Sequence, residues 1–189
     1  DLNVNGIVYP NLEVVNTTIN KDLAGKTVTV YINGTKTSTS VLIGANGEIQ
    51  YTSTILAAGE YNIVIEYPGD TNYNSQNSTI GTFTVSKQNP RFSTLTVNNI
   101  TFSNVEAVNA TITGDSITGT VNVYINNELV GTTDIESKGE IQYNNNTLPV
   151  GEYNVIFEYL GDDNHSSLNS TPASFNVTRH PSSITIPTG

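Results

Sequence analysis

The chain contains one sequence twice, and this internal repeat constrains the fold more than any other feature. The run TVTVYIN at 27–33 returns as TVNVYIN at 120–126, and GEIQY at 47–51 returns at 139–143. The copies lie 93 residues apart at the first run and 92 apart at the second. A repeat of this length has the size of a small domain, not of a single solenoid unit. We therefore expect two copies of one domain in tandem.

Pro90 marks the boundary between the two copies. A proline fixes its own φ and biases the preceding residue toward extended conformations, so the run SKQNPR at 86–91 predicts a short, stiff linker. We expect one domain over residues 1–88 and a second over 89–179. Residues 180–189 begin with a similar His-Pro pair and predict a linker that leads toward the first strand of a further repeat. We therefore expect the chain to be part of a longer one.

Apolar residues occupy every second position through most of each copy, which is the period of a half-buried β-strand. The pattern is clearest at 61–67, and the second copy repeats it at 153–159. Asn-Gly and Gly-Asp pairs, which favour tight turns, separate such runs. The pattern predicts an all-β chain of two antiparallel β-sandwiches with about seven strands each. In the first copy the expected strands cover 2–9, 12–20, 26–33, 37–43, 47–53, 60–67 and 80–87.

A tyrosine motif supports the sandwich. The pattern L-x-x-G-x-Y occurs at 56–61 and again at 148–153. Its spacing matches a tyrosine corner, in which the Tyr hydroxyl bonds back to the backbone a few residues upstream. Ile63 and Val155 stand two residues later, where disulfide-bonded domains of this kind carry a cysteine. Each buried aliphatic side chain contributes about 1.5–3 kcal/mol, comparable to the ~2–4 kcal/mol of a disulfide, so we expect an aliphatic core to replace the bridge.

The acidic composition excludes several classes of function. Acidic residues outnumber basic ones by 17 to 7, which gives a formal net charge of −10. Nucleic acids and anionic membranes bind basic surfaces, so we expect no nucleic-acid partner and no insertion into a membrane. The chain has only His165 and His180 and no cysteine. The absence of cysteine excludes a cysteine nucleophile, and two histidines make a histidine-rich metal site or a Ser-His-Asp triad improbable. We therefore predict that the chain is not an enzyme.

Two further runs carry a family resemblance. The run EYPGDTNYNS at 66–75, followed by TFTV at 82–85, is matched in the second copy at 158–167 and 174–177. These runs resemble the Ig-like repeats of very large bacterial surface proteins, and the wealth of Asn and Thr resembles the adhesin-like proteins of methanogenic archaea. The resemblance implies two Ig-like β-sandwich domains in an extracellular, cell-surface stalk or adhesion module. It implies as partners neighbouring Ig-like repeats, and surface glycans or proteins of other cells.

Two other functions stay open at this point. The chain could be a glycan- or protein-binding module that uses Tyr31 and Tyr124, which the alternation places on the outer face of a sheet, with the loops 69–77 and 161–169. An outward tyrosine more often covers its strand neighbours than a ligand. The other alternative is a structural subunit of a surface filament or of a phage-like tail decoration.

The loop after 60–67 has oxygen-bearing side chains at alternating positions, as calcium loops do. Asp70 and Asn72 are matched in the second copy by Asp162 and Asn164. The Gly and the Glu that complete an EF-hand loop are missing, and Asp and Asn commonly shape turns through hydrogen bonds to the backbone. We therefore predict turn-forming residues and no cofactor. If calcium binds, these four residues are the expected ligands.

Covalent cross-links between side chains are a second possibility that the sequence disfavours. An isopeptide bond needs a lysine, but no lysine recurs at equivalent positions of the two copies. An ester cross-link needs a Gln and a Thr, and Gln50 with its counterpart Gln142 is the only recurring candidate. We expect the lysines to be solvated; they are Lys21, Lys26, Lys36, Lys87 and Lys138.

Two glutamates recur in both copies, namely Glu13 with Glu106 and Glu66 with Glu158. A pair of carboxylates across a cleft can hydrolyse glycosides. In a thin sandwich, the outward Glu66 and Glu158 have a simpler role, which is solvated charge on a strand face. We predict no catalytic, cofactor-binding or metal-binding residue.

Nine N-x-[ST] sequons accompany the wealth of Asn, Thr and Ser. In a secreted chain of a glycosylating organism, several of them would carry glycans, and a glycoprotein is the corresponding expectation. The sequons lie at Asn16, Asn33, Asn77, Asn99, Asn109, Asn145, Asn164, Asn169 and Asn176.

Overall fold

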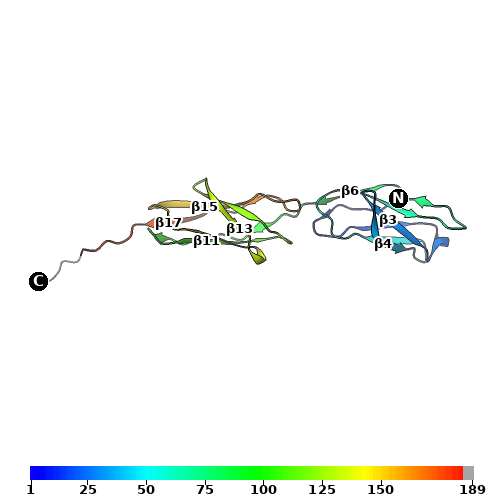
Figure 1. The fold of residues 1–189 in the computed structure, drawn as a ribbon, viewed down its shortest axis with the longest axis horizontal. Coiled ribbons are helices and arrows are strands. Elements are labelled where there is room, and N and C mark those ends of the chain that lie inside the picture. The colour runs from blue at the N-terminus through cyan, green and yellow to red at the C-terminus, as the bar shows by residue number, and fades with distance from the viewer. Residues whose placement is uncertain (185–189) are drawn as a thin grey trace. The chain divides into compact units, whose positions relative to one another are not determined.

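The computed structural model describes residues 1–184 of the chain. It divides into two compact units, Asp1–Gln88 and the residues from Asn89 onward. Each unit is a pair of facing β-sheets, and the predicted all-β class with two tandem β-sandwiches is confirmed (Figure 1). The expected continuation into a further repeat at 180–189 lies in part outside the described residues.

Unit 1 has one large sheet and one small sheet. The large sheet has the order β1-β8-β6-β3-β4, with β7 paired to β6, and the small sheet consists of β2 and β5. The strands are β1 Ile7–Val8, β2 Val14–Thr18, β3 Thr27–Ile32, β4 Thr35–Leu42, β5 Glu48–Thr52, β6 Gly59–Tyr67, β7 Gln76–Asn77 and β8 Gly81–Ser86.

Unit 2 repeats this arrangement and adds one strand. Its large sheet has the order β10-β17-β15-β12-β13 with β16 paired to β15, and its second sheet has the order β14-β11-β9. The strands are β9 Arg91–Phe92, β10 Ile100–Thr101, β11 Glu106–Thr113, β12 Thr120–Ile125, β13 Glu128–Asp134, β14 Glu140–Asn145, β15 Gly151–Tyr159, β16 Leu168–Asn169 and β17 Ala173–Thr178.

The first predicted strand of unit 1 is wrong in extent and in pairing. Residues 2–9 do not form one strand, because Asn3 forms a bridge with Asn16 on the small sheet whereas Ile7–Val8 pairs with β8 on the large one. The pairing of β1 with β8 is parallel, and so is that of β10 with β17, so the sandwiches are not purely antiparallel. The two-residue period shows which side chains point inward, but it does not show which sheet supplies the partner strand.

The short strands were also missed by the alternation. The strands β7, β9 and β16 have only two residues each. No period is visible in so short a run.

Helical structure is limited, within the described residues, to two 3-10 turns, η1 Lys21–Leu23 and η2 Ser137–Gly139. No helix in this part of the chain is long and apolar enough to cross a membrane. The repeated GEIQY run begins with a glycine for a steric reason. Gly47 and Gly139 have φ values of +85° and +77°, and a Cβ on either would collide with the carbonyl oxygen of Ile19 or Ile112.

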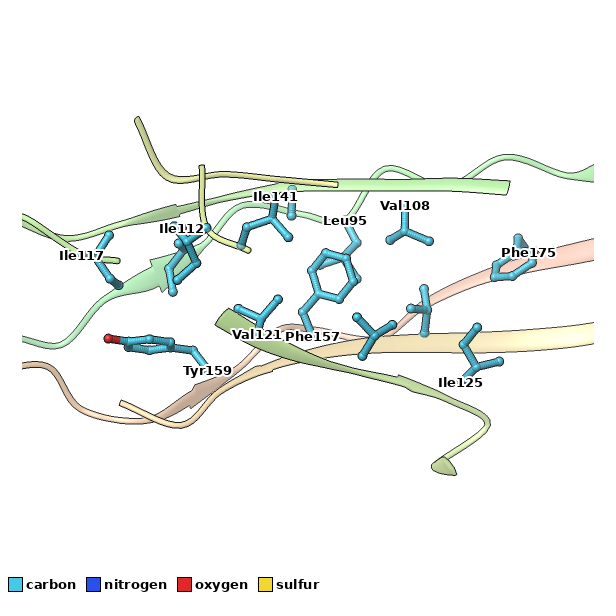
Figure 2. Packing of buried hydrophobic residues seen from close by; sticks show 14 of the residues in the cluster. Leu95, Val108, Ile112, Ile117, Val121, Ile125, Ile141, Phe157, Tyr159 and Phe175 are labelled. Carbon is cyan, nitrogen blue, oxygen red and sulfur yellow. The ribbon is translucent and has the colours of Figure 1, made fainter. Parts of the chain in front are cut away.

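The inward positions of the strands form one apolar core in each unit. Ile63 and Val155, the residues expected to replace a disulfide, are both fully buried. In unit 2, Phe157 rises from the large sheet toward Leu95, while Ile112 and Ile141 approach from the opposite sheet (Figure 2). The core therefore joins the two sheets without a covalent bond, as predicted.

The predicted tyrosine corner is present in both units. Tyr61 Oη donates to the carbonyl oxygen of Ala57 at 2.9 Å, and Tyr153 Oη donates to that of Pro149 at 2.8 Å. Each ring also stacks on a phenylalanine of the last strand, with 5.5 Å between ring centroids in both cases. The motif thus ties the crossing between the sheets to the end of the core.

Removal of the corner hydroxyl should destabilise the unit that carries it. An intramolecular hydrogen bond contributes about 0.5–1.5 kcal/mol, so Tyr61→Phe and Tyr153→Phe should each lower the free energy of unfolding by up to about 1 kcal/mol in urea titrations. Tyr73→Phe is the matched control, because the exposed Tyr73 lies outside the corner. An equal loss in this control would contradict the assignment.

Candidate functional site

Two polar clusters occur at equivalent places in both units. We call the first the aspartate turn; it covers residues 69–74 after β6 and 161–166 after β15. We call the second the Tyr–Glu pair; it consists of Tyr31 with Glu66, and of Tyr124 with Glu158, on the outer face of the large sheet.

The aspartate turn of unit 1 is built around the Asp70 carboxylate. Its Oδ1 accepts the backbone N–H groups of Asn72 at 2.8 Å and Tyr73 at 3.0 Å. Its Oδ2 accepts the hydroxyl of Tyr67 at 2.7 Å. Gly69 precedes it at φ +82°, where a Cβ would lie 2.7 Å from the backbone nitrogen of Ser75. Glycine and aspartate are therefore both required by the shape of this turn.

A cation completes the cluster in unit 1. Lys26, which directly precedes β3, forms an ion pair with Asp70 Oδ2. The Lys26 ammonium also lies 5.3 Å from the ring centroid of Tyr73. The two charged side chains are partly exposed, at 36% for Lys26 and 28% for Asp70. Exposed pairs of this kind contribute little individually, on the order of 0–1 kcal/mol.

The aspartate turn of unit 2 has the same backbone contacts. Asp162 Oδ1 accepts the N–H groups of Asn164 and His165, both at 2.7 Å. Asp162 Oδ2 accepts the hydroxyl of Tyr159 at 2.9 Å. Unit 2 has Gly119 at the position of Lys26, so the cationic side chain of unit 1 is missing there.

In unit 2, the side chain that contacts the aspartate is His165 instead of a lysine. Its Nδ1 lies 2.9 Å from both carboxylate oxygens of Asp162, and its Nε2 lies 3.0 Å from the carbonyl oxygen of Asp115. The side chain is 2% exposed. A histidine at the position of Tyr73 therefore joins the turn to the loop before β12, as Lys26 does from the sequence position before β3.

The contacts of Asp162 shift its titration. Burial raises the pKa of the carboxyl, but the His165 ring, the N–H groups of Asn164 and His165 and the Tyr159 hydroxyl outweigh burial and lower the pKa to about 2. Burial and the adjacent carboxylate raise the pKa of Tyr159. The ionised form of Asp162 is thus the form that the fold stabilises.

These contacts confirm the turn-forming role predicted for Asp70 and Asp162. The backbone N–H groups two and three residues ahead bond to each carboxylate, as in Asx turns. Residues 1–184 contain no group of three or more His, Asp or Glu that could hold a metal ion. Asn72 and Asn164, the other two expected ligands, lie in the same turns and donate their backbone N–H groups to the carboxylates.

The shift at Asp162 predicts a loss of stability in acid. The folded-state pKa, about 2, lies below the ordinary value of 3.8, so the stabilisation is present above pH 4 and is lost as the pH falls toward 2. Thermal unfolding should show that Asp162→Asn is less stable than the wild type at pH 6 and that the difference narrows by pH 2. The adjacent Asp163→Asn is the control and should match the wild type throughout. A constant difference at all pH values would argue against the assignment.

Lys26 in unit 1 and His165 in unit 2 contact the aspartate of their turn. Whether one can replace the other is tested by introducing a histidine into unit 1. Lys26→Ala should lower the free energy of unfolding by up to ~1 kcal/mol, because it removes the cation beside Asp70. Adding Tyr73→His should restore part of this loss by recreating the cluster of unit 2. Urea titration of the two single variants and the double variant measures the coupling. Lys36→Ala, an exposed change on β4, serves as the control; strictly additive effects would refute the transfer.

The Tyr–Glu pair lies on the outer face of the sheet formed by β3 and β6. Tyr31 Oη donates to Glu66 at 2.7 Å, and Tyr124 Oη donates to Glu158 at 2.9 Å. In unit 2, Asn122 also donates to Glu158, at 3.0 Å.

These contacts shift three pKa values. The hydrogen bonds to the glutamates raise the pKa of Tyr31 and of Tyr124. The contacts from Asn122 and Tyr124 lower the pKa of Glu158. Both rings are half-buried, and the strand register places Tyr31 and Glu66 diagonally across neighbouring strands.

The other recurring pair of glutamates lies inside the sandwich. Glu13 and Glu106 are buried, and Oε1 of each accepts a backbone N–H, from Asn5 at 2.7 Å and from Asn98 at 2.8 Å. Both side chains are therefore shielded from solvent. Burial raises the pKa of Glu106, and among the described residues its Oε2 has no hydrogen-bond partner.

The residues considered for cross-links have ordinary contacts. Gln50 Nε2 donates to Asn16 at 3.0 Å, and Gln142 Nε2 donates to Asn109 at 2.9 Å, so both glutamines form cross-strand amide pairs. Lys21 lies in η1 and Lys138 in η2.

The chain matches the profile of the bacterial Ig-like domain (group 3) family twice, over residues 10–86 and 93–178. One match falls in each unit, and together they cover most of the chain. No protein of curated function matches it.

Several solved structures resemble the chain at low sequence identity. The fibronectin(III)-like modules of CbhA from Clostridium thermocellum are 18% identical, with a TM-score of 0.40 and coverage of 95% of each chain. An I-band fragment of titin is 12% identical, with a TM-score of 0.42 and coverage of 95% of this chain and 65% of the fragment. A bacterial ice-binding adhesin is 18% identical, with a TM-score of 0.34 and coverage of 94% and 63%. At these scores the likenesses decide nothing about function.

Proposed function

Because this chain belongs to the bacterial Ig-like domain (group 3) family, we propose that it is a non-enzymatic stalk segment of a large extracellular, adhesin-like surface protein. Its task would be to carry tension and to present other parts of the protein to surface glycans or proteins of other cells. The abundance of Asn and Thr, similar to that of methanogenic adhesin-like proteins, fits the same setting.

The parallel pairing of a strand near the start of each unit with the last strand of that unit carries this proposal. In unit 1, Ile7 of β1 lies opposite Val85 of β8 in parallel register, and Ile100 pairs with Val177 in the same way in unit 2. Because the strands are parallel, tension between the two ends of a unit pulls them past each other along their length. The hydrogen bonds between them are then loaded together instead of one at a time.

Additional hydrogen bonds reinforce this terminal pairing. The N–H of Tyr9 donates to the carbonyl oxygen of Ser86 at 2.9 Å, and that of Phe102 donates to Thr178 at 2.8 Å. In unit 2, the N–H of Asn176 also donates to the side chain of Asn99, at 2.8 Å. The same terminal arrangement in two repeats is what an array under tension requires.

The net charge and the separate cores of the two units support the same role. A net charge of −10 opposes self-association of an extended array. Each unit has its own buried core, so one unit can unfold while the other stays folded.

Single-molecule stretching of residues 1–189 tests the stalk. We expect two separate unfolding events, each lengthening the chain by roughly 25–30 nm, because an extended chain spans at most about 3.3–3.6 Å per residue. Phe102→Pro removes the N–H that bonds Thr178 and should lower the force of one event while the other keeps its value.

The matched control for this test is Leu160→Pro. Unit 1 already has Pro68 at the equivalent position, so a proline there should leave both forces unchanged. A single unfolding event, or equal forces for wild type and Phe102→Pro, would count against a stalk.

The Tyr–Glu pair supports a second candidate, a glycan- or protein-binding module. A half-exposed ring beside a carboxylate can stack on a sugar while the carboxylate accepts its hydroxyl groups. Saturable binding of residues 1–189 to a glycan array or to cells, lost in Tyr31→Ala with Tyr124→Ala, would favour this module over a stalk. Tyr73→Ala, a change of an exposed tyrosine in the aspartate turn, is the control.

A further inference from the structure

A buried carboxylate holds the chain at the point where it changes sheets. Near the start of each unit, the chain crosses from one sheet to the other. In unit 2 it forms a bridge from Thr96 to Asn109 on the second sheet and pairs from Ile100 with β17 on the large one. Between these two points, Glu106 Oε1 accepts the backbone N–H of Asn98 at 2.8 Å.

Unit 1 has the same contact. The chain forms a bridge from Asn3 to the small sheet and pairs from Ile7 with β8 of the large one. Between these points, Glu13 Oε1 accepts the backbone N–H of Asn5 at 2.7 Å. In both units the accepting carboxylate lies 8 residues after the donor. The contact therefore belongs to the repeated domain and not to one copy of it.

A carboxylate at this place is costly for the fold of unit 2. Glu106 is 1% exposed, and its Oε2 has no hydrogen-bond partner among the described residues. A buried polar or charged group costs free energy unless its hydrogen bonds are satisfied, and an apolar side chain of similar size would avoid that cost. An apolar side chain would also lose the contact with Asn98. Holding the crossing is thus the role that accounts for a carboxylate here.

The crossing segment is otherwise attached mainly at its ends. We call it the strap; it covers residues 96–102. Its first end is the bridge to the second sheet, and at its last end the two-residue β10 pairs with β17. Its apolar side chains, Val97 and Ile100, are half-buried at the margin of the core. Segments with few buried apolar contacts open locally at a lower free energy than the whole domain.

We propose that Glu106 is a latch on this strap: the strap opens as one piece while the rest of unit 2 stays folded, and the bond from Asn98 to the carboxylate keeps it closed. The closed strap supplies the parallel partner of β17. Because β10 is the edge strand of the large sheet, the open strap leaves backbone groups of β17 unpaired, and such edges pair with other chains. The latch acts in the unloaded chain, so it does not depend on the proposed stalk.

Three backbone N–H groups report on the strap, because each joins it to the rest of unit 2. They belong to Asn98, Phe102 and Asn176. The N–H of Phe157, which donates to Ser170 Oγ inside the sandwich, reports on the whole unit. In native-state hydrogen exchange of the full chain, we expect the three strap amides to share one opening free energy, lower than that of Phe157. Their exchange should also respond less to added urea, because local opening exposes less surface. Exchange of all four amides through global unfolding alone would overturn the proposal.

The latch itself is tested by Glu106→Ala and Glu106→Gln. The alanine variant lacks the acceptor, so exchange at the three strap amides should accelerate together, by about tenfold or more relative to that of Phe157. The glutamine variant keeps a side-chain oxygen at the same place and should stay within about threefold of the wild type. Glu128→Ala, an exposed change on β13, is the matched control and should leave all four rates unchanged.

Two results in Glu106→Ala would contradict the latch. One is equal acceleration of the strap amides and of Phe157, which would mean that the carboxylate only stabilises the unit as a whole. The other is acceleration at Asn98 alone, which would mean that the strap does not open as one piece. The wild-type measurement decides the case even if the alanine variant does not fold.

Discussion

The fold of each unit depends on the apolar contact between two sheets that no covalent bond joins. Ile63 and Val155 are fully buried at the centre of this contact, where related sandwiches place a disulfide. The stability of the sandwich therefore comes from close packing and from the hydrogen bonds at its margins. Neither depends on the redox state of the surroundings.

The margins of the core are closed by polar contacts that recur in both units. Tyr61 and Tyr153 tie the crossing between the sheets at one end, and the carboxylates of Asp70 and Asp162 organise the turn at the other. The carboxylate and its backbone contacts are the same in the two turns, but the side chain that faces it differs. The turn is therefore constrained by geometry more tightly than by the identity of its basic partner.

A segment near the start of each unit pairs in parallel with the last strand of that unit. The parallel terminal strands place the two ends of a unit on neighbouring strands, where tension shears a row of hydrogen bonds. In unit 2, Phe92 of the preceding strand packs between the sheets against Phe157. The proposed mechanical role thus depends on the segment with which the chain enters a unit.

Much of this arrangement was predictable from local patterns. The internal repeat indicates two domains, the two-residue period indicates sandwiches, and the spacing L-x-x-G-x-Y indicates the tyrosine corner. Asp70 and Asp162 were assigned to turns because a short carboxylate side chain bonds to nearby backbone N–H groups. The contact of Lys26 with Asp70 and that of His165 with Asp115 join residues 44 and 50 positions apart, so no local pattern contains them.

By itself, the sequence determined which side chains point inward, where the turns fall and that the chain carries the same domain twice. These properties depend on neighbours within a few residues, and the repeat shows them twice. Only the tertiary structure decided which sheet the first segments join and that Glu13 and Glu106 are buried. These outcomes depend on contacts between distant segments, because a strand or a carboxylate is placed by the partner that folding brings to it.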